Sequence, residues 1–347
     1  MPRRWGWRRL GGAGVAALLA ALLISTSAVA AEKASIAVLK LASSGAIFIA
    51  QSKGYFAAEG LDTQLKFLDA AQPVALAVVS GDADIGATGL TAGFYNLAGK
   101  GALRIFGGQS REEPGYHLIA YLVSNKAYDA GLKKLGDLAG HSVAITQVGS
   151  TFHYSLGLLA EKLHFDLASV HLVPLQSMSN MAAALKGGQV DAALIPGTIA
   201  APMVDRGEAH LLGWVGDETP WQLGALFASV RTVEERKPML QAFLRAYRKG
   251  ARELYDAFLK KGPDGKPQEG PGAAALLPIL AEYTGQSVDQ LKSAIPYVDP
   301  DAALLVDDIH HQVSWYQEHS LVNKNVEAGP IVAAGFVEGQ IAPTGAR

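Results

Sequence analysis

Short segments rich in serine, threonine and glycine recur where predicted strands give way to predicted helices. A helix N-terminus carries free N–H groups and roughly half a positive charge, and hydroxyls there help to hold an anion without a full counter-charge. The alternative is ordinary helix capping, which favours these residue types. Because the set recurs along the chain, we favour a binding role. The segments are Ser43-Ser44-Gly45, Thr88-Gly89-Leu90-Thr91, Ser150-Thr151 and Ser177-Met178-Ser179-Asn180.

Three further side chains are candidates for the same site. Arg111 follows a predicted strand and could pair with a carboxylate or sulfonate, the alternative being a solvated loop. His153 lies at the start of a predicted helix. Trp214 ends an apolar run and could cover a ligand ring, the alternative being packing in the core.

Motifs for catalysis, metals and cofactors are missing from the sequence. It has no G-x-S-x-G or P-loop motif, and it contains no cysteine, which excludes disulfides and thiolate chemistry. Asp307 and His311 have an i,i+4 spacing that suits a metal, but no third ligand is evident, so a solvated helix face is favoured. We therefore expect no catalytic residue, metal or cofactor.

Short apolar runs alternate with helical patterns, which predicts an α/β fold. The expected strands are 35–41, 61–67, 83–87 and 102–106, and then 142–147, 170–174 and 192–196. The expected helices between them are 46–59, 73–80, 90–98, 152–163 and 178–186. From 232 onward the pattern is helical, with Pro238 favouring a kink or a fresh start and three more helices at 273–283, 288–295 and 304–319.

One offset superimposes the two strand-rich stretches. Adding 107 to residue numbers 43, 44, 81 and 84 gives 150, 151, 188 and 191, and the residues agree as Ser/Ser, Ser/Thr, Gly/Gly and Asp/Asp. We interpret this as two lobes wound in the same way. In open α/β sheets ligands bind beyond the carboxyl ends of the strands, where the hydroxyl segments of both lobes should lie.

The N-terminus has the layout of a secretory signal peptide. The first 30 residues hold four arginines and no acid, residues 13–24 are apolar apart from glycine, and Ala28-Val29-Ala30 forms an A-x-A site. We expect cleavage after Ala30 and a soluble periplasmic product, a membrane anchor being the alternative. Removing four of 30 basic residues leaves 26 against 32 acids, a formal charge of −6, which argues against nucleic acid as a partner.

Four segments resemble the substrate-binding proteins of ABC importers, in the nitrate/sulfonate/taurine family that also holds binders of thiamine pyrimidine precursors. The resemblance implies a two-lobed, type II periplasmic-binding-protein fold, each lobe a doubly wound mixed sheet. Beyond the signal peptide at 1–30, which its own layout predicts, the resemblance implies a first lobe at 34–123 plus 223–340 carrying the helical C-terminal segment, and a second lobe at 124–222. The segments are GYFAAEGLD (54–62), VVSGDADIGATG (78–89), KLGDLAGHSVAITQVGST (134–151) and ALKGGQVDAALIP (184–196).

The same resemblance implies a function and partners. The family's ligand loops fall on Ser43, Ser44, Thr88, Gly89, Ser150, Thr151, Ser179 and Asn180. The expected function is capture of a small organic anion, a sulfonate or carboxylate with an aromatic group as one option, and delivery to a permease and its ATPase. We expect a monomer without turnover. A neutral pyrimidine, a same-fold enzyme of thiamine pyrimidine or chorismate metabolism, and a ligand sensor for a membrane receptor are the alternatives.

Overall fold

The structure is a computed structural model that describes residues 1–3, 5 and 30–337. It divides into two units, Met1–Ala31 and Glu32–Arg347, and everything below concerns the second. The apolar run expected at 13–24 lies outside the described residues, so the signal peptide stays a prediction. Within the described ranges no helix combines the length and apolar character needed to cross a membrane.

The first sheet has five strands in the order β2-β1-β3-β11-β4. β1 runs parallel to β2 and β3, whereas β11 runs antiparallel to β3 and β4. Its strands are β1 (Glu32–Leu39), β2 (Leu61–Leu68), β3 (Ile85–Gly89), β4 (Leu103–Gly108) and β11 (Gly224–Ser229).

The second sheet repeats this arrangement in the order β8-β7-β9-β6-β10. β7 is parallel to β8 and β9, and β6 is antiparallel to β9 and β10. The α/β fold with two mixed sheets of matching topology is thus confirmed. The strands are β6 (Ile119–Ser124), β7 (Ser142–Ile145), β8 (His171–Pro174), β9 (Ala192–Pro196) and β10 (Ala209–Trp214).

Two connections cross between the sheets, because β6 joins the second sheet and β11 returns to the first. The connections pair with each other where the Glu112 N–H donates to the Trp221 carbonyl (2.9 Å) and the Trp221 N–H to the Glu112 carbonyl (3.1 Å). A first lobe that ends at residue 123 would separate β6 from its sheet. We propose that the boundary lies earlier, between this pairing and β6.

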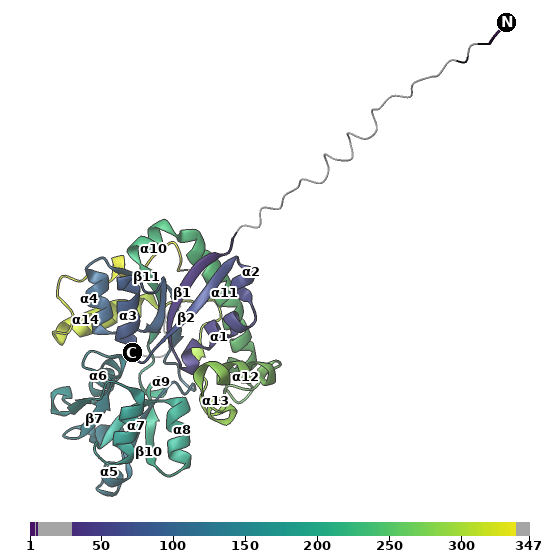
Figure 1. Ribbon diagram of the computed structural model, residues 1–347. Helices are drawn as coiled ribbons and strands as arrows, with labels where there is room; N and C mark the ends of the chain where they lie inside the picture. Colours follow the sequence, from purple (N-terminus) through teal and green to yellow (C-terminus); the bar gives the residue numbers. More distant parts are fainter. Residues whose placement is uncertain (4, 6–29, 338–347) are drawn as a thin grey trace. The chain divides into compact units, whose positions relative to one another are not determined.

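Most of the expected helices are present (Figure 1). The helix expected at 46–59 is divided, because Gly54 takes a left-handed conformation (φ 71°) that suits glycine and ends regular helix. With the first sheet lie α1 (Gly45–Ser52), α2 (Tyr55–Ala58), α3 (Ala71–Ser80) and α4 (Ala92–Gly99). With the second lie α5 (Asn125–Asp129), α6 (Thr151–Leu163), α7 (Met178–Lys186), α8 (Gly197–Asp205) and α9 (Val215–Glu218).

The C-terminal segment is helical as expected, and Pro238 lies in the first turn of a new helix, α11. Phe243, Tyr247 and Leu254 on α11 are fully buried, and the helix packs on α1. A short strand pair formed by β5 and β12 joins the tail to the first crossover. The elements are β5 (Ser110–Arg111), α10 (Val230–Glu235), α11 (Lys237–Leu254), α12 (Ala273–Thr284), α13 (Val288–Ser293), β12 (Tyr297–Val298) and α14 (Val306–Glu318).

Helix α14 contacts elements that accompany both sheets. It packs on α4, and the Tyr95 hydroxyl of α4 donates to Gln312 (2.8 Å). On the other side the ring of Trp315 lies so close to Gly157 of α6 that a Cβ there would approach it to 2.0 Å. The Tyr316 hydroxyl donates to the carbonyl of Ser150 (3.2 Å). The tail therefore packs on both lobes, which extends the prediction that it packs on the first.

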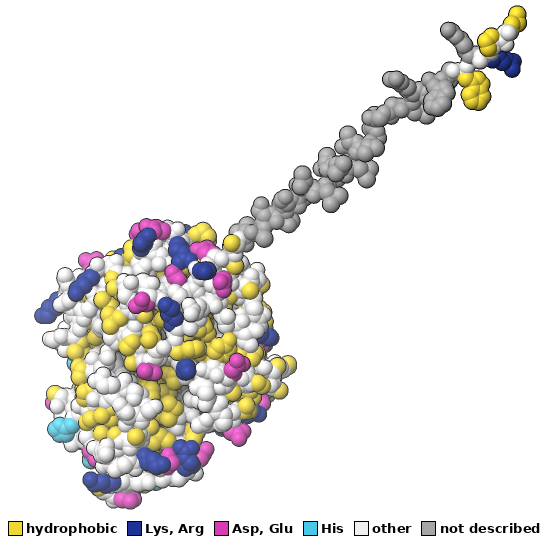
Figure 2. Space-filling view, viewed as in Figure 1, with side chains coloured by type: hydrophobic (Ala, Val, Ile, Leu, Met, Phe, Trp, Pro, Cys, Tyr) yellow, Lys and Arg dark blue, Asp and Glu magenta, His cyan; other side chains and the backbone are white. Residues whose placement is uncertain are grey.

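Figure 2 shows apolar side chains gathered across the middle of this face, with single charged side chains among them and more charged side chains towards both ends. Two exposed apolar residues, Leu76 and Val79, belong to α3 and are 49% and 40% exposed.

Candidate ligand-binding cavity

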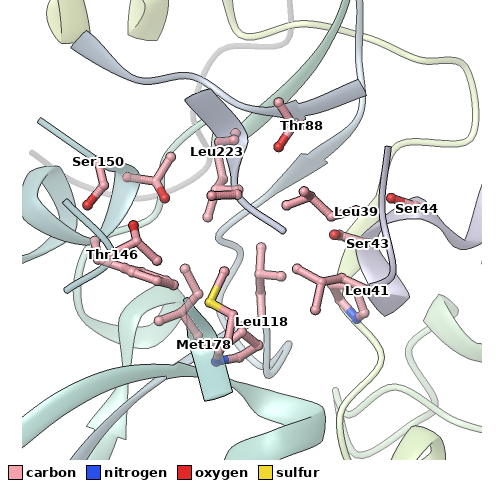
Figure 3. A pocket seen from close by; sticks show the side chains of 18 of the residues that line it. Leu39, Leu41, Ser43, Ser44, Thr88, Leu118, Thr146, Ser150, Met178 and Leu223 are labelled. Carbon is pink, nitrogen blue, oxygen red and sulfur yellow. The ribbon is translucent and has the colours of Figure 1, made fainter. Parts of the chain in front are cut away.

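A cavity lies where the carboxyl ends of strands from both sheets meet (Figure 3). It is lined from the ends of β1 and β3 in the first sheet and of β7 and β9 in the second, together with the starts of α6 and α7. Its empty volume is about 820 Å³, including the part that opens to solvent.

Six of the predicted site residues line this cavity. They come from three separate segments, so the structure brings together what the sequence places more than 100 positions apart. That these residues contact a ligand stays a prediction. The six are Ser43, Ser44, Thr88, Gly89, Ser150 and Thr151.

Arg111 does not line the cavity, although its side chain is buried. Its guanidinium pairs with Glu113 (3.2 Å) and Asp299 (3.7 Å) and stacks 4.4 Å from the ring of Tyr297. Two of these three partners come from the C-terminal segment. The solvated-loop alternative does not describe this buried side chain, which connects the first crossover to the C-terminal segment. A ligand contact of Arg111 stays a prediction.

His153 also lies outside the lining, one helical turn into α6. Its Nδ1 accepts a hydrogen bond from the Gly149 N–H (3.1 Å), and its ring meets Trp315 edge to face. Burial lowers the pKa of His153 to about 4. The imidazole is therefore neutral at physiological pH and supplies no positive charge.

The three remaining predicted residues lie away from the cavity as well. Ser179 and Asn180 are exposed on α7, and the Asn180 side chain donates to the carbonyl of Leu175 (2.9 Å). Trp214 stacks on the ring of His117 with centroids 4.2 Å apart. Of the segment around α7, Met178 is the residue that lines the cavity.

Sequence reasoning missed several lining residues. Thr146 and Thr198 follow β7 and β9, so the rule that ligands bind beyond strand ends could have found them. The aliphatic part of the lining carried no such signal, because leucine in an α/β chain is expected in the core. This part includes Leu39, Leu41, Leu118 and Leu223.

Some hydroxyls around the cavity have partners within the described part of the protein, and two buried ones do not. Ser150 Oγ accepts from the His153 N–H (3.3 Å) and Thr91 Oγ1 from the Phe94 N–H (3.1 Å), so here the N-cap alternative holds. Ser44 Oγ and Thr88 Oγ1 are different, because within the described residues neither has a hydrogen-bond partner. Ser44 is 1% and Thr88 3% exposed.

Buried hydroxyls without a partner are costly and rare in folded proteins. Figure 3 shows the Thr88 side chain directed towards the interior of the cavity from one wall, with Ser43 and Ser44 on a neighbouring wall. The arrangement offers two hydrogen-bonding groups that a bound molecule could satisfy.

The two lobes touch beside the cavity. The Ala92 N–H at the start of α4 donates to the carbonyl of Gly149 (2.9 Å). A Cβ at Gly89 would lie 2.7 Å from Thr151 Cγ2, so this position in the first lobe faces the second at very close range. The structure thus holds the lobes in a closed arrangement.

Two lobes of matching topology around a cavity at the strand ends define a periplasmic-binding-protein fold. A family model described as NMT1/THI5 like matches residues 42–257, and the chain belongs to this family.

Solved structures with the same fold include binding proteins for small anions. The alkanesulfonate-binding protein SsuA from Xanthomonas axonopodis pv. citri, bound to MOPS, is 20% identical, with a TM-score of 0.68 over 86% of this chain and 97% of that one. The periplasmic nitrate-binding protein NrtA from Synechocystis PCC 6803 is 11% identical, with a TM-score of 0.69 over 88% and 86%. The periplasmic aliphatic sulphonate binding protein SsuA from Escherichia coli is 19% identical, with a TM-score of 0.67 over 86% and 96%. No curated protein matches the chain.

Proposed function

We propose that this chain is the solute-binding component of an ABC importer, exported to the periplasm. It captures a small organic solute in the cavity between its lobes and delivers it to a membrane permease and its ATPase. The observation that carries the proposal is the pair of buried, unpartnered hydroxyls, Ser44 Oγ and Thr88 Oγ1, at the wall of a cavity between two lobes. The binding proteins that share the fold support it.

The cavity lining favours capture over turnover. None of its residues is an aspartate, glutamate, histidine, lysine or arginine, so the lining supplies no general acid or base. No cluster of three potential metal ligands occurs in the part of the chain that the structure describes. These observations speak for a binding protein rather than for the alternative of a same-fold enzyme.

The experiment is a ligand screen with two variants. The protein lacking residues 1–30 is tested by thermal shift and then by calorimetry against sulfonates, carboxylates, nitrate, pyrimidines and uncharged organic molecules. A ligand at 100 times its Kd stabilises the protein by about 2.7 kcal/mol, which raises Tm by several degrees. Saturable binding without chemical change of the ligand supports the proposal.

The variant Ser44→Ala combined with Thr88→Val should weaken that binding by about 1 kcal/mol per lost hydrogen bond. Ser179→Ala is the matched control, since Ser179 belongs to a predicted ligand segment but is exposed and outside the lining. Equal losses in both variants, or conversion of the ligand to a product, would count against the proposed site and role.

A further inference from the structure

The charge of the lining bears on the class of solute. Every residue that lines the cavity is neutral, and much of the lining is aliphatic or aromatic. Ion pairs and hydrogen bonds to charged partners are what make burial of an ionised group tolerable in a protein interior. A carboxylate or sulfonate in this cavity would have no full counter-charge in the wall around it.

Two candidates for such a counter-charge that the sequence offers, Arg111 and His153, do not supply it. Arg111 is paired with Glu113 and Asp299 and does not reach the lining. His153 is neutral, because burial lowers its pKa to about 4, and its Nδ1 already accepts the Gly149 N–H.

The helix N-termini, which the sequence analysis offered as anion holders, are partly occupied. The hydroxyl oxygens of the N-cap residues Thr91, Ser150 and Ser177 accept first-turn N–H groups of α4, α6 and α7, respectively. The first N–H of α4 donates across the cleft to Gly149. Helices α1, α3 and α8 also begin at the lining, and none of their N-cap residues, Ser44, Ala70 and Pro196, makes a side-chain cap. The first N–H of α8, from Gly197, donates to the carbonyl of Leu118 (2.8 Å).

The free polar groups suit an uncharged partner. A hydroxyl both donates and accepts a hydrogen bond, so Ser44 Oγ and Thr88 Oγ1 can serve a carbonyl, an amide, a hydroxyl or a ring nitrogen. Opposite them the lobes supply Leu118, Met178 and Phe152, which favour an apolar body.

We propose that the solute is a neutral organic molecule with an apolar body and a hydrogen-bonding group held by Ser44 and Thr88. This inference rests on the proposed function of the cavity. It replaces the small organic anion that the sequence predicts with an uncharged class of ligand.

The test uses matched pairs that are close in shape and differ in charge. The pairs are benzamide and benzoate, an alkanesulfonamide and the corresponding alkanesulfonate, and a pyrimidine carboxamide and the corresponding pyrimidine carboxylate, measured by calorimetry on the protein lacking residues 1–30. In parallel, protein purified from the periplasm is denatured and any small molecule it releases is identified by mass spectrometry.

We expect the neutral member of a binding pair to bind at least about tenfold more tightly than its anion. Its Kd should not change between low and high salt, because no charge is screened. Thr88→Val, which keeps the shape of the side chain, should raise that Kd by up to about tenfold, while Ser179→Ala leaves it unchanged.

Two results would overturn the inference in distinguishable ways. An anion that binds as tightly as its neutral partner, or a released solute that is an anion at neutral pH, refutes the solute class but leaves the binding role intact. No binding in either arm together with no released solute refutes the binding role itself, and the inference with it.

Discussion

Gly89→Ala is the sharpest test of how the lobes close. Gly89 ends β3 in the first lobe, and a Cβ there would lie 2.7 Å from Thr151 Cγ2 at the start of α6 in the second. Carbon atoms pack best at roughly 3.5–4.0 Å, so the added methyl group overlaps by about 1 Å. Leu223 Cδ2, at 3.4 Å, leaves little room on the other side.

The size of the effect follows from this overlap. Overpacking by one methyl group costs typically ~1–3 kcal/mol. Because the clash exists when the lobes are closed, the variant disfavours the closed state selectively. A solute that binds the closed state then loses the same free energy, which corresponds to a Kd raised about 5- to 150-fold.

The assay is a double-mutant cycle in solute affinity, measured by calorimetry with a solute from the screen. Thr151→Ser removes the Cγ2 atom in the clash and keeps the hydroxyl, so the double variant should recover most of the lost affinity. Gly136→Ala is the control, since a Cβ there meets nothing within 4 Å. If the double variant loses as much affinity as Gly89→Ala alone, the clash between residue 89 and Thr151 is not the cause of the loss, and the reasoning is refuted.

Three further predictions concern stability. Burial raises the pKa of Asp308 to about 6 from an ordinary 3.8, so the folded state binds the proton more tightly than the unfolded state. The free energy of unfolding should therefore fall as the pH rises from about 4 to 6. Asp308→Asn should abolish up to ~3 kcal/mol of that fall, measured by thermal unfolding at several pH values. Asp191 accepts hydrogen bonds from the N–H and the hydroxyl of Ser142 (2.9 and 2.8 Å). Asp191→Ala should lower the free energy of unfolding in urea by ~1.5–3 kcal/mol. The control Asp205→Ala, at an exposed aspartate, should lower it less. Tyr316→Phe removes the bond to the Ser150 carbonyl and should cost ~1 kcal/mol by the same measurement; an unchanged midpoint would mean that this bond does not stabilise the fold.

The internal repeat could be predicted from the sequence because the two lobes form the same local structure with the same residue types. The repeated aspartates, Asp84 and Asp191, each accept the N–H and hydroxyl of a serine at the strand next to them. Those serines, Ser35 and Ser142, obey the same offset of 107, a match that the sequence analysis overlooked. The same hydrogen bonds are made by the same residue types in both lobes, so the repeat is visible in the sequence.

Contacts between segments that are distant in the sequence could not be predicted in this way. The partners of Arg111 could not be predicted, because Tyr297 lies on β12, a two-residue strand with no sequence signal of its own, and Asp299 follows that strand. The same holds for Trp214, since its stacking partner His117 lies about a hundred residues earlier. Long-range pairing of this kind depends on the assembled fold, not on local pattern.

The repeat also separates structural residues from candidates for recognition. Where both lobes keep the same residue with the same bonds, as at Asp84 and Asp191, the role is to hold the fold. Thr88 has no polar counterpart, because the same offset leads to Ile195. Ser44, by contrast, keeps a hydroxyl counterpart in Thr151, and residues near both sheets contribute hydroxyls to the lining. Thr88 is therefore the departure from the repeat at the strand ends, and its buried, unpartnered hydroxyl makes it the first candidate for a residue that serves the solute rather than the fold.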